Sequence, residues 1–388
     1  MNEVKIVIAG DFCPHDRVKR LISNNDYDKV LSNVESVIAS ADYSLVNLEA
    51  PIANEDANPI PKWGPNLRCD SHIIEGLKYA GFKGVTLANN HFYDYGENGA
   101  LNTFSELRKN GIEYVGAGNN LKEAAQILYK QIKGKNFAFI NCCEHEYSIA
   151  TNNSAGSNPL NPIQQYYAIK EARQNSDFVI VITHGGIETY QLPTPRMQET
   201  YRFFIDAGAD IVINHHQHCF SGFERYKGKY IYYGLGNFCF DWNGKRKSTW
   251  NEGFLLMITF TDNGISCSEI PYVQCDDKAE VSLMNDEKQE EFQKKIKALN
   301  ACIVNPIELE QNYNLYVEKT AKLYDELHPY SNIYLKALYK RGLIPSFFGK
   351  KKLRSIENKI VCESHYDRFV KMIRIRINNV DNCNSKAK

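Results

Sequence analysis

From residue 4 to about residue 275, short apolar runs alternate with segments of helical periodicity. The first run, KIVIAGD at residues 5–11, predicts a buried strand that ends in an acidic residue. Residues 28–41 then space their apolar side chains as a helix does, with intervals of three and four. The same alternation predicts further strands over 43–49, 84–91, 136–143, 177–186, 210–218 and 229–238, and further helices over 71–81, 98–111 and 196–209. This order predicts a mixed-sheet α/β domain.

The pattern changes near the end of this region. Residues 254–270 contain an Asn-Gly pair between apolar runs, which predicts an antiparallel hairpin. Beyond residue 275, long polar stretches with helical spacing predict helices over 285–300 and 307–327. We therefore expect two parts, an α/β domain over residues 1–275 and a helical, basic extension over residues 276–388.

Composition and charge narrow the class of protein. The 388 residues are 43% hydrophobic and 24% charged, an ordinary globular balance, and the net charge is zero. Global charge thus favours neither a nucleic-acid nor a membrane partner. Residues 340–376, however, hold eleven Lys and Arg against three acids, a net charge of +8. This basic tail either docks on the acidic remainder, binds polyphosphate, makes a peripheral contact with an anionic surface, or is a solvated helical appendage.

Cysteine usage and apolar run length bear on location. The eleven cysteines form no CxxC pair, and many lie inside apolar runs, which is typical of buried reduced thiols. The start of the chain lacks a signal-peptide pattern, and its apolar runs, such as FVIVI, are too short for a transmembrane segment. These observations predict a cytoplasmic protein in a reducing compartment.

Polar residues with metal-binding chemistry stand where the predicted strands end. In α/β sheets, ligands gather at the carboxyl ends of strands, so residues dispersed in sequence can meet there. Carboxylate, amide and imidazole donors together suit divalent Mn, Fe, Zn or Mg. The residues concerned are Asp11, Glu49, Asn90, His91, His184, His216 and His218.

This donor set is large enough for two divalent ions. Glu49 is the natural bridge, because its two carboxylate oxygens can serve one ion each. The other ligands then divide between the ions, Asp11 and His218 on one and Asn90, His184 and His216 on the other. In the sequence NHHQH, residues 214–218, alternation along an extended strand end places His216 and His218 on one face and turns His215 away.

Such a pair of ions indicates hydrolysis, because it lowers the pKa of a shared water and neutralises charge in the displacement. His91 is the candidate acid that protonates the leaving group, and Asp94 is the candidate group that orients it. Glu188 and Arg196 are weaker candidates for substrate binding. Their structural alternatives are an ion-pairing surface role for Glu188 and a solvated position at a helix start for Arg196.

Six motifs in order carry a resemblance to a known family. GDFC, NLEAPI, ANNHFYDYG, THGGIETY, GADIVINHHQH and YYGLGNFCFD, across residues 4–260, resemble the CapA family of bacterial capsule and poly-γ-glutamate synthesis proteins, a branch of the calcineurin-like metallophosphoesterases. The resemblance implies a four-layer α/β/β/α sandwich with a dimetal site between the sheets. It also implies metal roles for the six ligands assigned above and makes His91 the acid histidine.

The sequence departs from the pattern of the wider superfamily at several positions. Cys13 stands where the first motif usually has a histidine, so either Cys13 or His15 would have to supply that ligand. Asn214 and Gln217 replace the usual glycine and proline around the paired histidines. The best-known family members carry a membrane anchor, whereas we expect none here.

Together these observations predict a metallophosphoesterase-type hydrolase whose metal-bound hydroxide attacks a phosphoester of an anionic small molecule or polymer. The expected setting is capsule or cell-surface polymer synthesis. Two alternatives remain open: an amide or γ-glutamyl hydrolase that uses the same dimetal site, and a non-catalytic polymer-binding or assembly factor for a capsule synthase.

Overall fold

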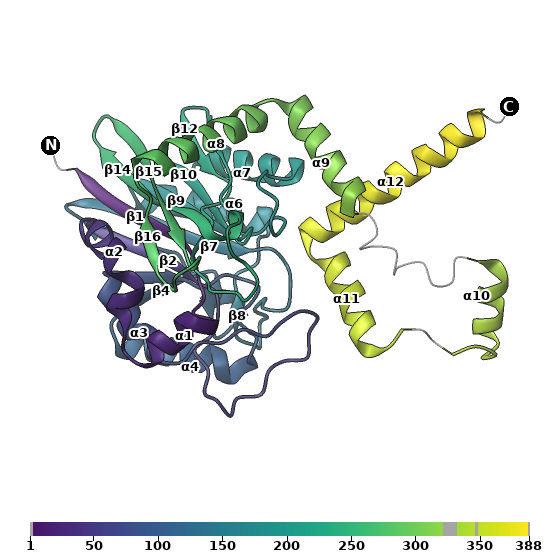
Figure 1. The fold of residues 1–388 in the computed structure, drawn as a ribbon, viewed down its shortest axis with the longest axis horizontal. Coiled ribbons are helices and arrows are strands. Elements are labelled where there is room, and N and C mark those ends of the chain that lie inside the picture. Colours follow the sequence, from purple (N-terminus) through teal and green to yellow (C-terminus); the bar gives the residue numbers. More distant parts are fainter. Residues whose placement is uncertain (1–2, 321–331, 346–347, 387–388) are drawn as a thin grey trace.

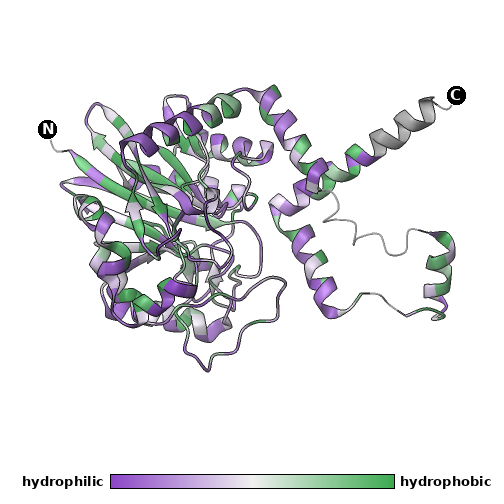
Figure 2. Ribbon diagram, viewed as in Figure 1, coloured by the Kyte–Doolittle hydropathy of each residue, from purple (hydrophilic) through white to green (hydrophobic). Residues whose placement is uncertain are grey.

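Two mixed β-sheets lie face to face with helices on their outer sides, and a group of helices follows at the C-terminal end (Figure 1). The computed structural model describes residues 3–320, 332–345 and 348–386. Figure 2 shows the hydrophobic residues concentrated in the strands, whereas hydrophobic and hydrophilic residues mix along the C-terminal helices.

Both sheets combine parallel and antiparallel neighbours. The larger sheet has the order β16 (Val281–Leu283), β15 (Gly264–Gln274), β14 (Glu252–Thr261), β1 (Val4–Phe12), β2 (Tyr43–Leu48), β3 (Gly84–Thr86) and β4 (Glu113–Val115), with β13 (Asn237–Cys239) also paired to β1. The smaller sheet has the order β11 (Phe223–Tyr226), β12 (Lys229–Tyr232), β10 (Ile211–His215), β9 (Phe178–His184), β7 (Lys135–Cys143) and β6 (Leu128–Ile132). A short pair, β5 (Ala117–Gly118) and β8 (Gly156–Ser157), lies apart from both.

The alternation of side chains along the strands builds three apolar layers. Ile6 and Ile8 of β1 face the space between the sheets, where they pack in one cluster with residues of β7, β9 and β14. Val7 and Ala9 face the opposite way, toward the first group of helices. On the far side of the smaller sheet, Val181 packs against the second group. The molecule is therefore an α/β/β/α sandwich, which confirms the predicted fold class.

The outer helices fall into these two groups. The larger sheet is covered by α1 (Asp16–Ser23), α2 (Tyr27–Ala39), α3 (Ile73–Ala80) and α4 (Gly96–Lys109). The smaller sheet is covered by α6 (Pro162–Asn175), α7 (Pro195–Ala207) and α9 (Pro306–Thr320). The chain also contains the single-turn α5 (Leu121–Ala124) and a 3₁₀ turn at Thr249–Asn251.

The predicted strands 84–91 and 210–218 prove shorter than expected. β3 ends at Thr86, and beyond it the side chain of Asn89 donates to the carbonyl oxygen of Leu48, the last residue of β2. β10 ends at His215, because His216 adopts a φ of 93°, outside the range of a strand. The predicted strand 229–238 divides into β12 and β13, which belong to different sheets.

Past residue 275 the chain stays in contact with the sandwich. β16 extends the larger sheet, and Phe292 and Ile296 of α8 (Asp286–Val304) pack in the cluster between the sheets. The predicted helix over 307–327 is α9 up to Thr320, and its remainder lies outside the described residues. Three more helices follow, α10 (Ile333–Lys340), α11 (Lys350–Val361) and α12 (Glu363–Lys386). The division at residue 275 stays a prediction.

The sequence predicts reduced cysteines and no membrane-spanning segment. The ten cysteines whose side chains the structure describes are all free thiols, and most are buried. None of the described helices combines the length and the apolar character needed to cross a bilayer.

Candidate metal centre

At the carboxyl ends of β1 and β2, three donor groups converge. Asp11 is the penultimate residue of β1, Glu49 follows β2, and His218 comes from the loop after β10. The Nδ1 atom of His218 lies 3.6 Å from Oδ2 of Asp11, and its Nε2 atom lies 3.6 Å from Oε1 of Glu49. All three side chains are buried. They match the first predicted ligand set.

The second predicted set also meets at Glu49. The Nε2 atom of His184 lies 3.7 Å from Oε1 of Glu49, 3.0 Å from Oδ1 of Asn90 and 3.1 Å from Nδ1 of His216. In each trio, Asp11–Glu49–His218 and Glu49–His184–His216, the donor atoms lie within 4.8 Å of one another. Glu49 thus belongs to both trios, which is the position that a bridging ligand requires.

The environment of Glu49 fits a bound cation. Both of its carboxylate oxygens are buried and find no hydrogen-bond partner among the described residues. Burial, and next the nearby Asp11 carboxylate, raise the pKa of Glu49 well above its usual value. A buried carboxylate without partners is costly, whereas divalent ions would satisfy its oxygens and those of Asp11 together. The residues present therefore fit two divalent metal ions.

Two asparagine side chains orient the donor groups through hydrogen bonds. The Oδ1 atom of Asn237 lies 2.9 Å from Nδ1 of His218, so this ring nitrogen carries the proton and donates it. The Nε2 atom, which faces Glu49, then offers its lone pair to an ion. Asn47 donates from Nδ2 to Oδ1 of Asp11 at 2.8 Å. Sequence reasoning missed both residues, although Asn47 lies within the NLEAPI motif and Asn237 within GLGNF. Their polar side chains inside apolar strands were the available signal.

In the NHHQH segment, His215 points away from His216 and His218 as predicted, but the backbone conformation that produces this arrangement differs from the prediction. An extended strand end was expected, whereas the backbone turns into the left-handed region at His216, with φ 93°, and at His218, with φ 54°. Non-glycine residues adopt this region at a cost, which is commonly found at functional sites. His215 still belongs to β10 and its Nε2 atom lies 3.0 Å from the carbonyl oxygen of Ala9, so His215 binds the backbone of β1.

The two departures beside the histidines hold this loop in place. Asn214 donates to the carbonyl oxygens of Gly185 and Tyr233, and its Oδ1 atom accepts from Tyr201. Gln217 donates to the carbonyl oxygen of Tyr190. These amides supply hydrogen bonds that glycine and proline side chains cannot make, so the sequence differences serve to position the histidines.

We expect His215→Ala to retain both metal ions, whereas His218→Ala loses one or both. The His215 variant should unfold more easily by about 1–3 kcal/mol, because the buried Ala9 carbonyl loses its donor. Metal content per folded chain, measured after dialysis, checks the contrast. Equal metal loss in the two variants would contradict the assignment of His215.

His91 lies beside this centre as part of a buried charged group. Its Nδ1 atom lies 2.7 Å from Oδ2 of Asp94, and Lys62 forms a buried ion pair with the same carboxylate. Asp94 also accepts the backbone N–H of Leu67, so it is firmly fixed. Burial lowers the pKa of His91, and this effect prevails over the opposing effect of Asp94. Lys62 was not predicted, since a single lysine in a loop rich in proline carries no sequence signal.

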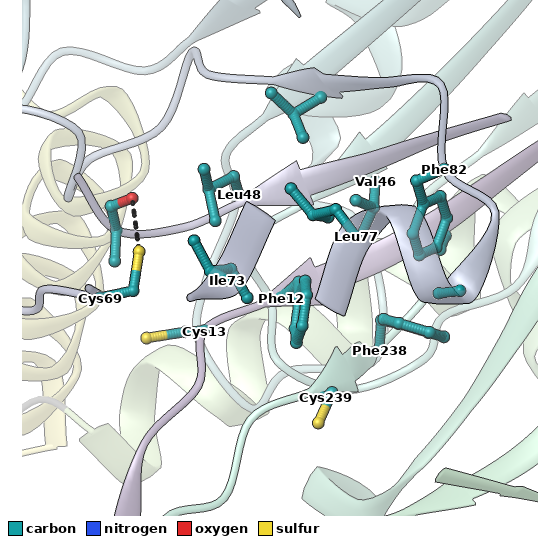
Figure 3. Packing of buried hydrophobic residues seen from close by; sticks show 14 of the residues in the cluster. Phe12, Cys13, Val46, Leu48, Cys69, Ile73, Leu77, Phe82, Phe238 and Cys239 are labelled. Atoms are coloured by element: carbon teal, nitrogen blue, oxygen red, sulfur yellow. Dashed lines mark hydrogen bonds between the residues drawn. The ribbon is translucent and has the colours of Figure 1, made fainter. Parts of the chain in front are cut away.

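Neither candidate for the missing histidine of the first motif joins the donors. Cys13 is fully buried in the apolar cluster beneath the larger sheet, near Phe12, Ile73 and Cys69 (Figure 3). Burial, chiefly, raises the pKa of its thiol well above the usual value, which disfavours a thiolate ligand. The ring of His15 instead stacks on Trp242, with 4.7 Å between the ring centroids.

The two weaker substrate-binding candidates have different surroundings. The side chain of Glu188 reaches solvent, although the protein atoms around its carboxylate remove part of its hydration, which would raise its pKa. The nearby imidazoles of His218, His216 and His91 outweigh this effect and lower the pKa. It therefore faces the donor cluster from a position open to solvent. Arg196, at the start of α7, contacts the carboxylate of Asp367 on α12 at 3.3 Å. Its role in substrate binding stays a prediction.

That contact belongs to a wider attachment of the C-terminal helices beside the centre. Ser364 donates to Glu144 at 2.8 Å, and the carboxylate of Glu363 accepts the backbone N–H of His145 at 2.8 Å. Two basic residues of the tail, Lys359 and Arg368, are buried. This part of the basic tail thus docks on the sandwich, one of the open alternatives, while a peripheral contact with an anionic surface stays a prediction.

Comparisons with known proteins identify the family that this chain resembles. The family described as bacterial capsule synthesis protein PGA_cap matches residues 5–242. The chain is 31% identical over 277 residues to the capsule biosynthesis protein CapA of Bacillus anthracis, which covers 69% of this chain and 67% of that protein. It is also 31% identical over 245 residues to the PGA biosynthesis protein CapA of Bacillus subtilis (strain 168), with coverage of 62% and 64%. The alignments thus span about two thirds of these relatives. Among solved structures, a novel phosphatase from Mycoplasma pneumoniae matches with a TM-score of 0.44, at 16% identity over 71% of this chain and 96% of that one.

Proposed function

The chain belongs to the family of bacterial capsule synthesis proteins, as its motifs predict, and we propose that it acts there as a metal-dependent phosphoester hydrolase. The observation that carries the proposal is the pair of donor trios that share Glu49, with His91 beside them. Two divalent ions held by these residues would supply a water of lowered pKa and neutralise charge on the ester.

The protein's own residues would divide the remaining work. His91 uses Nδ1 for its contact with Asp94, so Nε2 of the protonated imidazolium form is left to give a proton to the leaving oxygen, and the neutral imidazole remains. Asp94 fixes the ring and compensates the charge of Lys62 in the same buried group. Glu188, open to solvent beside the histidines, is placed to contact the incoming substrate or its water.

The substrate we propose is an anionic ester related to a capsule polymer, since both CapA relatives are named for capsule or PGA biosynthesis. Their names also favour a second candidate, cleavage of a γ-glutamyl amide at the same centre. Metal-assisted hydrolysis extends to carbonyl compounds, so the donor set alone does not separate the two.

We expect the full chain, loaded with Mn²⁺, to hydrolyse p-nitrophenyl phosphate or bis(p-nitrophenyl) phosphate and to lose this activity after treatment with EDTA. A γ-glutamyl p-nitroanilide serves as the competing substrate. Cleavage of the anilide alone would replace the phosphoesterase with the second candidate. A chain that binds the metal but cleaves neither compound would instead be a non-catalytic polymer-binding or assembly factor.

A further inference from the structure

A second cluster of donor atoms lies where the C-terminal helices attach to the sandwich. It consists of Glu146, in the segment after β7, Cys362, between α11 and α12, and His365, in the first turn of α12. Each residue offers one donor atom, and the three atoms lie within 4.8 Å of one another. None of these residues belongs to the two trios around Glu49.

We propose that Glu146, Cys362 and His365 form a separate zinc-type metal site that ties the C-terminal extension to the sandwich. Thiolate sulfur, imidazole nitrogen and carboxylate oxygen are the donors that zinc takes in proteins. The Sγ atom of Cys362 lies 3.9 Å from Oε1 of Glu146. Donor atoms around a tetrahedral zinc are roughly 3.3–3.8 Å apart, from bond lengths of about 2.0–2.3 Å, so movements below about 1 Å would close the site.

The sequence around α12 prepares two of these ligands. Cys362 immediately precedes the first residue of α12 and also caps the C-terminal end of α11, so the dipoles of the two helices oppose each other at its sulfur. Burial, and next the Glu146 and Glu144 carboxylates, raise the pKa of its thiol well above the usual value, so the thiol would lose its proton only as the ion binds. His365 is the third residue of α12, and the side chain of the residue directly before a helix lies beside the third helical position, as in a capping box. Both side chains can therefore be directed to one ion without a change in the helix.

The third ligand is held against this turn by contacts already present. The segment that carries Glu146 also contributes Glu144, which accepts from Ser364, and Tyr147, whose hydroxyl donates to the carbonyl oxygen of Arg354 at 2.9 Å. These bonds fix the distance between the two halves of the site. Glu146 and His365 are partly exposed, so solvent can reach a fourth coordination position.

The competing interpretation is a thiol that makes ordinary hydrogen bonds. Cys362 lies 3.7 Å from Oε2 of Glu144 as well as 3.9 Å from Glu146, so a protonated thiol has acceptors without any ion. The two interpretations differ in one measurable property, because only the metal site brings the sulfur into a bond with the ion.

Co²⁺ added to the metal-free full chain should produce a near-ultraviolet thiolate-to-cobalt charge-transfer band. The band should vanish in Cys362→Ser, and that variant should bind one ion fewer per chain than the wild type. Cys13→Ser is the matched control, because Cys13 is a buried thiol close to the Glu49 centre yet packed in the apolar cluster. It should keep the band and the full number of ions.

Absence of the band in the wild type, or its retention in Cys362→Ser, would overturn the proposal. Loss of the band in Cys13→Ser would place the thiolate at the Glu49 centre and would equally overturn it. The inference is independent of the phosphoesterase proposal: Glu49→Gln should abolish hydrolysis but keep the band. A chain that shows the band yet hydrolyses no phosphoester would therefore refute the proposed function alone.

Discussion

Replacing Glu49 with glutamine is expected to remove both metal ions from the Glu49 centre and to reduce kcat/KM by at least about 10³-fold. The reason is that Glu49 takes part in both donor trios, so a single substitution weakens both ions together. Loss of the ions also removes their stabilisation of the charge that develops in the transition state, which amounts to several kcal/mol. Metal analysis of the dialysed protein and steady-state kinetics with a phosphoester measure the two effects.

The stability of the variant distinguishes ligand loss from misfolding. Without metal, Glu49→Gln should be at least as stable as the wild type, because the amide removes a buried carboxylate beside Asp11. A hundredfold excess of Mn²⁺ over its Kd should stabilise the wild type by about 2.7 kcal/mol and the variant hardly at all. Glu188→Gln, which neutralises an exposed carboxylate facing the same histidines, should retain both ions. Full metal retention in Glu49→Gln would contradict the bridging role.

His91→Ala should lower kcat by about 10²–10⁴-fold with the metal content unchanged, because it removes the proton donor but no ligand. The loss should depend on the leaving group. Phenyl phosphate, whose leaving oxygen needs a proton, should be affected much more than p-nitrophenyl phosphate. Parallel kinetics with the two esters measure this difference.

An equal loss for both esters would mean that His91 acts through the shape of the site. The interpretation needs the buried group to stay intact, and truncation at His91 leaves the ion pair between Lys62 and Asp94 in place. Asp94 is less suited to such an experiment. Its removal would leave the buried Lys62 without its ion-pair partner and would destabilise the protein by about 3–5 kcal/mol, which would obscure the kinetics.

The convergence of the candidate ligands could be predicted from the sequence because each of them stands at or after the end of an apolar run with a clear period. Strand β1 leads directly into Asp11, and β9 ends at His184, so sheet topology alone brings these positions to one edge. The grouping of the donors around Glu49 followed from the number of oxygens that a carboxylate offers. These inferences rest on local sequence patterns and on coordination chemistry, and both can be read from the sequence without knowledge of the fold.

The parts that escaped prediction depend on contacts between distant segments. Lys62 comes from a loop, and its partner Asp94 is separated from it by 32 residues, so no periodicity connects them. The left-handed backbone at His216 was unexpected because few residues other than glycine adopt a positive φ, and the sequence carries no signal for which of them do. The attachment of α12 likewise follows from individual polar contacts, such as that of Ser364 with Glu144, which composition does not reveal.

The position of β14 decides whether the motif-bearing region can be stable as a separate fragment. The family match ends at residue 242, but β14, at Glu252–Thr261, supplies one of the two long neighbours of β1. A chain that stopped at the end of the match would turn the strand that leads into Asp11 into an open edge, with a row of unpaired backbone groups available to other molecules. Self-association, more than loss of ligands, would then limit such a fragment. The chemistry of the six motifs thus depends on a hairpin that contains none of them.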